Sequence, residues 1–367
     1  MKVKLIILKK IFLQKIIYLK IISGFIFFIL ILLKFPKKKV GVIGLEHSIN
    51  IGNNLLKYAM HILLSKFGFT PFIIGMRYYN QSISFIQNVT NLILINNSFS
   101  ELKENDYDIL MVNSDQTWRK WPNEYKYFYD IAFLKFAEKW DKIKFVYGAS
   151  LGTNIWGYNK SDEEIAICLL KKFKSISVRE KGAVDLIKEH LGITPYFVLD
   201  PTLLIDKQYY LNLIKDYMPK IQLKDKYIFI YTVALSNKVN FFINQINTIY
   251  KYKIFWVKEN IRDFIYGIYY SKAIITDSFH GTIFSIIFNK PFIAFLNEGT
   301  GVERFISLKG IFDIGNRLYD IQSNKTIPNI SLLEKPLNLN MKIYHSLKRK
   351  SIKYLKKNLK GSRFFKL

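Results

Sequence analysis

Cysteine is almost absent from this chain of 367 residues, and histidine is scarce. The single cysteine, Cys168, excludes a disulfide framework and a thiolate metal cluster within the chain. It stands in the stretch IAICLLKKF, which has the pattern of an apolar helix stripe, so we expect Cys168 to pack in the interior. The five histidines are scattered without HExxH or another paired spacing. We therefore predict neither a metal site nor a resident cofactor.

Acidic residues are missing from both ends of the chain. Residues 1–39 contain ten lysines and no acid, and residues 342–367 contain ten lysines or arginines and no acid. Leaving these twenty out of the 55 basic residues leaves 35 basic against 28 acidic residues in the body. Strongly basic tails on a nearly balanced body are typical of contact with an anionic membrane surface. Nucleic acid is not a predicted partner, because the body lacks a basic patch interleaved with aromatic residues.

The apolar run near the N-terminus is short. IISGFIFFILILL covers residues 21–33 between Lys20 and Lys34, whereas a spanning helix needs about 20 residues. No small-residue cleavage site follows it, which argues against a cleaved signal peptide. We interpret residues 1–38 as a lysine-flanked hydrophobic helix that anchors the protein to the cytoplasmic face of the membrane, as a monotopic or re-entrant segment. A single spanning anchor and a buried core helix are the alternatives.

From residue 39 onward, short apolar strands alternate with helical patterns, which favours mainly parallel sheets with helices on both faces. We predict an α/β fold with two Rossmann-like domains facing a cleft (GT-B-like), preceded by the N-terminal hydrophobic helix. The predicted domains are residues 39–205 and 222–330, followed by a basic C-terminal helix or tail over residues 331–367. The expected strands are residues 40–45, 70–74, 108–112, 144–147, 175–178, 196–199, 227–233, 253–257, 273–275 and 292–295.

The run IITDSFHGTIFSIIF, residues 274–288, places a polar segment between two apolar stretches. The first stretch predicts the end of a buried strand, and the second predicts a helix over residues 282–288. In an open α/β sheet, the carboxyl ends of strands and the helix starts that follow them form the ligand crevice. A helix start also offers backbone N–H groups to an anion. His280 can donate or take a proton there near neutral pH, or it can cap the helix, and both interpretations stay open.

Other polar clusters follow other predicted strands. Arg179 suits bidentate binding of a carboxylate or phosphate, or an ion pair with Glu180. Arg304, in GTGVERF, follows the strand after His280 and can reach the same crevice. We interpret Asp200-Pro201-Thr202 as a structural turn at the domain hinge. The remaining candidates, which would bind sugar hydroxyls or order their loops, are Asn50, Gly52, Asn53, Ser114, Asp115, Gln116 and Ser278.

The order of these motifs resembles that of the polysaccharide pyruvyl transferase family. The matching pieces between about residues 40 and 310 are SINIGNNLLKYAM, NSDQTW, YGASLG, SVREKGAVDLI, VLDPTLLI, ITDSFHGTIFSIIFNKPFIAF and GVERF. The resemblance implies a two-domain protein of GT-B type. It also implies transfer of an enolpyruvyl-derived group from phosphoenolpyruvate to two sugar hydroxyls as a cyclic ketal. The acceptor would be a surface polysaccharide or its lipid-linked precursor.

The resemblance also implies roles for single residues. His280 matches the expected acid/base of the family, and Arg179 and Arg304 fall at positions that bind phosphoenolpyruvate. We place Gly281 and Thr282 beside them at the donor-binding helix start. Asp115 and Gln116 match the SDQ motif. In one departure, Ser278 stands where some relatives carry an arginine, so Arg304 and Lys290 would have to replace it.

Two alternative functions remain at this point. One is a GT-B-type glycosyltransferase that uses a nucleotide sugar. The other is a catalytically silent, membrane-tethered sugar-binding protein, which the serine at position 278 would favour. A comparison of phosphoenolpyruvate with nucleotide sugars as ligands separates the three.

Overall fold

The computed structural model describes residues 37–45, 50–76, 84–120, 127–219, 227–250, 252–257, 260–296, 301–322 and 328–360. The predicted hydrophobic helix in residues 1–38 lies outside the described residues, apart from Lys37 and Lys38. Residues 39–367 form one compact unit. Within the described ranges, every helix is too short or too polar to cross a membrane.

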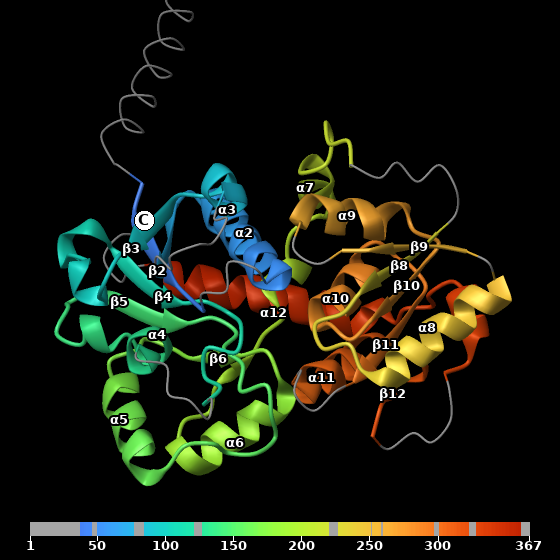
Figure 1. Ribbon diagram of the computed structural model, residues 1–367. Coiled ribbons are helices and arrows are strands. Elements are labelled where there is room, and N and C mark those ends of the chain that lie inside the picture. Colours follow the sequence, from blue (N-terminus) through green and yellow to red (C-terminus); the bar gives the residue numbers. More distant parts are fainter. Residues whose placement is uncertain are drawn as a thin grey trace, which may run out of the picture. The chain divides into compact units, whose positions relative to one another are not determined.

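The first sheet has five parallel strands in the order β3-β2-β1-β4-β5 (Figure 1). Along β4, Ile109 and Met111 join one hydrophobic cluster, whereas Leu110 and Val112 join another. Both faces of the sheet are therefore covered, as is usual for parallel strands, and the strands read as continuous apolar runs. The bounds are β1 Lys39–Ile43, β2 Thr70–Met76, β3 Leu92–Ile95, β4 Ile109–Val112 and β5 Ile143–Val146.

The helices and the small sheet of this half follow the expected alternation. The helices are α2 Ile51–Lys66, α3 Ser84–Val89, α4 Phe128–Phe133, α5 Lys160–Leu170 and α6 Lys181–Leu191. After α5, β6 Ser177–Val178 and β7 Tyr196–Phe197 form a two-stranded parallel sheet. Single bridges tie this sheet to the first, because Phe145 pairs with Ser175 and Ala149 pairs with Val178. The strand ends that carry Asp115 and Arg179 are thereby brought to one edge.

The second sheet also has five parallel strands, in the order β12-β11-β10-β8-β9. Its strands are β8 Tyr227–Tyr231, β9 Lys253–Trp256, β10 Ala273–Thr276, β11 Phe292–Leu296 and β12 Leu318–Asp320. Its helices, with the short linker helix before them, are α7 Lys207–Asn212, α8 Asn237–Tyr250, α9 Ile261–Tyr270, α10 Phe279–Ile287 and α11 Val302–Phe312. The prediction of an α/β protein with parallel sheets is confirmed.

The two sheets share one hydrophobic core. A single cluster of buried side chains contains Val40 and Tyr147 from the first half and Phe229 and Ile274 from the second. Helix α12, Met341–Leu359, also spans both halves. Its first turn packs on α11, and Tyr354 near its end donates its hydroxyl to the Val146 carbonyl at 2.7 Å. The predicted domain limits at residues 205, 222 and 330 stay predictions.

Two helices begin earlier than the sequence pattern indicates. α2 begins at Ile51 because the Asn50 side chain accepts a hydrogen bond from the Asn53 amide at 3.0 Å. α10 begins at Phe279, and the Ser278 hydroxyl caps it by accepting from the Gly281 amide at 3.3 Å. The candidate residues Gly52, Asn53, His280 and Gly281 therefore lie in first helical turns and not in the loops before them.

Other differences arise from packing that the pattern does not encode. Cys168 is exposed on α5, so the prediction of a buried cysteine is wrong. The stripe of α5 that is buried passes through Ala166, Leu169 and Leu170 instead. Helix α9 was not predicted, because it contains Gly267 and several aromatic residues that favour a helix weakly. A Cβ at Gly267 would lie 2.2 Å from the Phe229 ring. The close packing of this helix on the sheet therefore requires a glycine here, and that tertiary contact favours the helix.

Candidate active site

The carboxyl end of β4 carries the cluster Ser114-Asp115-Gln116. The Ser114 hydroxyl donates to the Gly148 carbonyl at 2.7 Å, which joins the ends of β4 and β5. Asp115 has a φ of 120°, a backbone conformation that is strained for a residue with a side chain. Its peptide is held there by the Ser150 amide, which donates to the Asp115 carbonyl at 2.9 Å. The carboxylate of this strained residue points toward other candidate residues, and strained backbone of this kind is common at functional sites.

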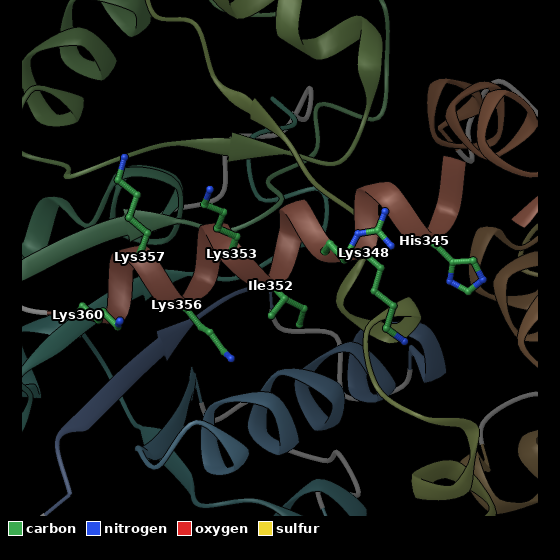
Figure 2. A pocket seen from close by; sticks show the side chains of 8 residues that line it. His345, Lys348, Ile352, Lys353, Lys356, Lys357 and Lys360 are labelled. Atoms are coloured by element: carbon green, nitrogen blue, oxygen red, sulfur yellow. The ribbon is translucent and has the colours of Figure 1, made fainter. Parts of the chain in front are cut away.

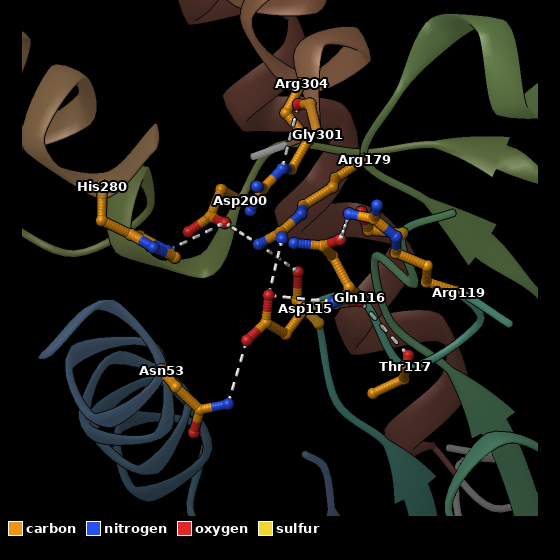
Figure 3. Close-up of polar contacts among 12 residues, drawn as sticks. Asn53, Asp115, Gln116, Thr117, Arg119, Arg179, Asp200, His280, Gly301 and Arg304 are labelled. Atoms are coloured by element: carbon orange, nitrogen blue, oxygen red, sulfur yellow. Dashed lines mark hydrogen bonds and ion pairs between the residues drawn. The ribbon is translucent and has the colours of Figure 1, made fainter. Parts of the chain in front are cut away.

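Arg179 follows β6 and links two carboxylates. Its Nη1 donates to Asp200 Oδ2 at 2.5 Å, and its Nη2 donates to Asp115 Oδ1 at 2.9 Å (Figure 3). The side chain is 1% exposed. The neighbouring Glu180 is farther away, with 4.0 Å between Arg179 Nε and Glu180 Oε1. Charge-assisted bonds of this kind are strong where water is excluded, so Arg179 fixes both aspartates.

Asp200 lies between Arg179 and His280. Its Oδ1 accepts from the Thr202 amide at 3.0 Å, and its Oδ2 faces His280 Nε2 at 3.7 Å, just beyond hydrogen-bond distance. Burial by itself raises the pKa of the Asp200 carboxyl, but His280 and Arg179 outweigh burial and hold that pKa well below its usual range. Asp200 is therefore a carboxylate at neutral pH, placed to orient the imidazole or stabilise its charged form.

His280 is held between two helix starts. It lies in the first turn of α10, is 5% exposed, and packs directly on the first turn of α2. A Cβ at Gly52 would lie 2.1 Å from His280 Nδ1, so only glycine permits this approach. Gly281 is needed for a similar reason, since its Cβ would lie 2.2 Å from the Thr276 hydroxyl. The N-termini of α2 and α10 consequently meet at the imidazole, in a positive backbone field.

Phe279 separates two arginines. The guanidinium carbon of Arg179 is 5.0 Å from the centre of its ring, and that of Arg304, on α11, is 4.9 Å from it. Burial, together with the positive charge of Arg179, lowers the pKa of Arg304 to about 10. Of the acidic residues whose charge acts on Arg304, Asp115 acts more strongly than Glu180, and burial raises the pKa of Glu180. Positive charge is thus concentrated on this side of the site.

Unpaired polar atoms gather at the same place. Among the described residues, five buried side-chain nitrogen or oxygen atoms have no hydrogen-bond partner. Four of them belong to this site, on Asn53, Asn113, Arg179 and His280. A buried polar atom without a partner costs about 1–3 kcal/mol, and such atoms are otherwise rare in folded proteins. Their concentration here indicates a binding function, because a ligand can satisfy them.

The structure brings most of the predicted site residues together. Asn53 Nδ2 donates to Asp115 Oδ2 at 2.9 Å, which joins α2 to β4. Gln116 accepts from Arg119 Nη1 at 2.7 Å. Asn50 is exposed and caps α2, while Thr282 donates its hydroxyl to the Ser278 carbonyl at 3.2 Å and supports the start of α10.

Lys290 lies elsewhere. Its Nζ donates to the Ser271 carbonyl at 2.9 Å, behind α10, and burial lowers the pKa of its ammonium group. The expectation that Lys290 helps to replace an arginine at position 278 is therefore wrong. Of the two basic residues suggested for that purpose, Arg304 is the one that shares the Phe279 ring with Arg179.

Sequence reasoning missed Asp200, Phe279 and Arg119 as residues of the site. Asp200 was interpreted as a hinge turn, yet it binds Arg179 and faces His280. Phe279 and Arg119 were not considered, although the charge of Arg119 acts on Arg304. A signal existed for Asp200 alone, since it is an acidic residue directly after an apolar strand, like Asp115. No group of three or more His, Cys, Asp or Glu side chains in the described ranges could hold a metal ion.

No curated protein matches the chain. Similar solved structures include the UDP-GlcNAc 2-epimerase from Neisseria meningitidis bound to UDP-GlcNAc, with a TM-score of 0.54 and 11% identity over 88% of this chain and 99% of that one. Another is the UDP-GlcNAc 2-epimerase from Methanocaldococcus jannaschii, with a TM-score of 0.52 and 14% identity over 87% of this chain and 99% of that one. At such identities the likeness concerns the GT-B-like fold alone.

The family model for polysaccharide pyruvyl transferase matches residues 50–299. This range contains α2, the polar residues that follow β4 and β6, and α10, and so includes His280, Arg179 and Asp115. Arg304 lies just beyond it. Because the match spans more than half of the sequence, the chain belongs to the polysaccharide pyruvyl transferase family, and the protein is a transferase enzyme.

Proposed function

We propose that this transferase moves the pyruvyl group of phosphoenolpyruvate onto two hydroxyls of a sugar, forming a pyruvate ketal. The acceptor is a surface polysaccharide or its lipid-linked precursor. The observation that carries the proposal is the buried His280, 3.7 Å from the Asp200 carboxylate and next to two arginines that share the Phe279 ring. A proton carrier beside concentrated positive charge is what an enol phosphate with a carboxylate requires.

The donor carries a carboxylate and a phosphate, and the site offers cations for both. Arg179 already binds Asp200 and Asp115, so we assign the direct donor contact mainly to Arg304. Arg179 contributes its charge, and its Nε has no hydrogen-bond partner among the described residues. Gly281 and Thr282 lie in the first turn of α10, whose backbone dipole favours an anion. Binding an anion there reduces the repulsion between the two guanidinium groups.

The reaction then proceeds through proton transfer. Protonation of the methylene carbon of phosphoenolpyruvate makes C2 electrophilic, and the first sugar hydroxyl attacks C2 and loses its proton. Phosphate leaves with the C2–O bond electrons, and the second hydroxyl attacks C2 and loses its own proton. The products are the cyclic ketal and phosphate, and the two hydroxyl protons end on the new methyl group and on phosphate. His280 is our candidate for carrying the proton to carbon, and Asp200 stabilises its charged form.

The acceptor side of the site is formed by the polar residues of α2 and β4. The Asn53 Oδ1 atom is buried without a hydrogen-bond partner in the described part of the chain, and Asp115 Oδ2 is oriented by the Asn53 amide. These oxygen atoms are acceptors that suit sugar hydroxyls. We therefore assign Asn53, Asp115 and Gln116 to the sugar, and we regard Asn50, Gly52, Ser114 and Ser278 as residues that order the site.

A titration with phosphoenolpyruvate, read by thermal unfolding of the full chain, tests the donor. A ligand that binds only the folded state raises stability by RT ln(1 + [L]/Kd). We expect a saturable rise in Tm that Arg304→Gln removes and that Arg262→Gln keeps. Arg262 is the matched control because it is exposed on α9 and contacts the Tyr217 ring instead.

The same titration separates the alternative functions. A rise in Tm with nucleotide sugars and none with phosphoenolpyruvate would replace the proposal by a GT-B-type glycosyltransferase. Donor binding without phosphate release on any sugar acceptor would favour a silent sugar-binding protein. Phosphate release that depends on both donor and acceptor supports the transfer reaction.

We also propose that residues 1–38 hold the enzyme on the cytoplasmic face of the membrane. The support is the sequence alone, in which a lysine-flanked apolar run precedes the catalytic unit. The full chain is expected in the membrane fraction and digestible by protease only after the cells are opened. Recovery of all the protein in the soluble fraction would contradict this proposal and leave the catalytic one intact.

A further inference from the structure

Helix α12 carries only one sign of charge. Between Met341 and Lys360 there are seven lysines and one arginine, and no acidic residue. Charged helices in solution commonly alternate positive and negative residues, whereas here Arg349, Lys353 and Lys357 follow one another at four-residue spacing. Like charges at this spacing destabilise a helix. An anionic partner would remove this repulsion.

The cations of α12 line grooves on two sides of the helix. Figure 2 shows Lys353 and Lys357 directed to one side, and Ile352 and Lys356 directed to the other. In the part of the chain that the structure describes, no acidic side chain forms an ion pair with any of these three lysines. One groove has a lining made almost entirely of basic residues, which are His345, Lys348, Arg349, Lys353, Lys356, Lys357 and Lys360, with Ile352 between them.

The second groove combines an apolar wall with a basic rim. It lies between α12, the end of α5, the end of α6 and β7, and its volume is about 880 Å³. Leu170, Phe173, Ile193 and Phe197 are among its apolar lining residues. The basic residues around it are Lys171, Lys174, Lys350, Lys353 and Lys357. No acidic residue belongs to this lining.

Exposed apolar residues lie at this groove and at the start of α12. Tyr196, at the groove, is 54% exposed, and Met341 and Ile343 on the first turn of α12 are 37% and 44% exposed. A surface with lysines around exposed aliphatic and aromatic side chains matches the boundary between lipid headgroups and acyl chains. A nucleic acid would satisfy the lysines but not the apolar wall, so the lipid surface is the better match.

We propose that the face of the protein formed by α12 and the groove beside it docks on an anionic phospholipid bilayer. The lysines of α12 contact headgroup phosphates, and the apolar wall near Tyr196 contacts the upper part of the acyl chains. This surface contains none of the residues 1–38 and does not depend on the pyruvyl-transfer reaction. It would hold the catalytic unit against the membrane, beyond what the N-terminal segment alone provides.

A fluorescent label placed at the groove tests the proposal in the full chain. The native cysteine is first removed by Cys168→Ser, which is mild because Cys168 is exposed. Thr194→Cys then places a polarity-sensitive label in the groove, and Thr248→Cys places it on α8 as the control. With vesicles of equimolar phosphatidylcholine and phosphatidylglycerol, we expect the label at position 194 to brighten and shift to the blue. The label at position 248 should not change, nor should either label with phosphatidylcholine alone.

Charge reversal identifies the residues responsible. Lys353→Glu with Lys357→Glu should raise the anionic-lipid concentration needed for the response at position 194 by about tenfold or more, because each lysine near such a surface contributes to binding. Lys207→Glu with Lys215→Glu changes the net charge equally on exposed residues around α7 and should leave the response unchanged. Circular dichroism checks that both pairs of variants stay folded.

The proposal is overturned by any of four results. In the first, the protein co-sediments with the vesicles while the fluorescence of the label at position 194 does not change. In the second, the labels at positions 194 and 248 respond alike. The control pair weakens the response as much as the α12 pair does. Finally, duplex DNA produces the same change at position 194, which would make the surface a general polyanion site.

Discussion

The imidazole of His280 meets a glycine on one side and a carboxylate on the other. Gly52 allows the first turn of α2 to touch the ring, and Asp200 faces its Nε2 atom. Each of these neighbours comes from a different segment, yet each acts on the same few atoms. Single substitutions at these three positions can therefore distinguish an effect on catalytic activity from an effect on folding.

Replacing the imidazole tests its role directly. His280→Ala is expected to lower kcat by about 10²–10⁴-fold, the usual contribution of a positioned acid/base, while the protein stays folded. Phosphate release in the presence of donor and acceptor measures the rate. His345→Ala removes an exposed histidine of α12 and should keep full activity. Full activity in the His280 variant would remove it from the mechanism.

Gly52→Ala is expected to displace the same ring without altering it. The added Cβ would lie 2.1 Å from His280 Nδ1, and a shift of about 1 Å at a reacting group can cost 10²-fold in rate. Gly310→Ala is the matched control, because nothing lies within 4 Å of its Cβ position on α11. That substitution should keep activity and raise stability slightly, as alanine favours a helix.

A double-mutant cycle identifies the cause of the Gly52 effect. In the presence of His280→Ala, the Gly52→Ala substitution should cost little further activity, because the ring that it displaces is gone. Equal losses in both backgrounds would mean that Gly52 acts through something other than His280.

At the scale of elements, α12 positions Asp200 from outside the site. The Leu199 amide, one residue before Asp200, donates to the Ser351 hydroxyl at 2.9 Å, and the Leu199 carbonyl accepts from Tyr147 at 2.9 Å. Helix α12 thus fixes the peptide that carries a residue of the site. It also ties the second half of the protein back to the first.

Ser351→Ala tests this connection. It leaves the buried Leu199 amide without its partner, so we expect a loss of about 1–3 kcal/mol in the free energy of unfolding. Catalysis should fall as well, because Asp200 loses part of its support. Ser346→Ala, on the same helix and only half-buried, should change stability by less than about 0.5 kcal/mol. Urea unfolding and kcat are measured for both, and equal effects would contradict the role of Ser351.

At the scale of the whole molecule, buried charges make stability depend on pH. The pKa of Asp200 is held below its usual range against the effect of burial, by His280 and Arg179. Burial also raises the pKa of Asp115, but Arg179, His280 and Arg304 lower it overall. A lowered pKa in the folded state contributes stability that is present above the unfolded pKa of about 3.9. That stability is lost as the pH falls through the folded pKa.

Asp200→Asn provides the test. At neutral pH the variant should be less stable by about 3 kcal/mol, because Arg179 loses one of its two buried carboxylates. The difference from the parent should shrink as the pH falls below about 4, because the Asp200 side chain then takes up a proton in the unfolded parent and the stability from its charge is lost as the pH falls toward the lowered folded-state pKa. Urea unfolding across this range measures it, with Asp185→Asn on the exposed face of α6 as the control. A difference that does not change with pH would show that the charge of Asp200 does not matter.

Much of this protein follows from local sequence. The apolar runs at residues 108–112 and 227–233 predict buried parallel strands, and the structure contains them as the slightly shorter β4 and β8. His280, Arg179 and Asp115 are recognisable because polar residues directly after buried strands lie at the ligand-binding edge. Gly52 is recognisable only as a possible turn, since nothing in the sequence shows that an imidazole lies against it.

The sequence by itself determined the α/β class, the parallel strands, the family and the polar clusters at strand ends, because these depend on apolar periodicity and on short motifs. Only the tertiary structure decided which clusters meet. Asp200, 80 residues before His280, faces it because both halves share one core. The tertiary structure likewise decided that the basic C-terminal residues form the surface of α12 with a groove beside it. Contacts between distant segments depend on packing and excluded volume, which no local pattern encodes.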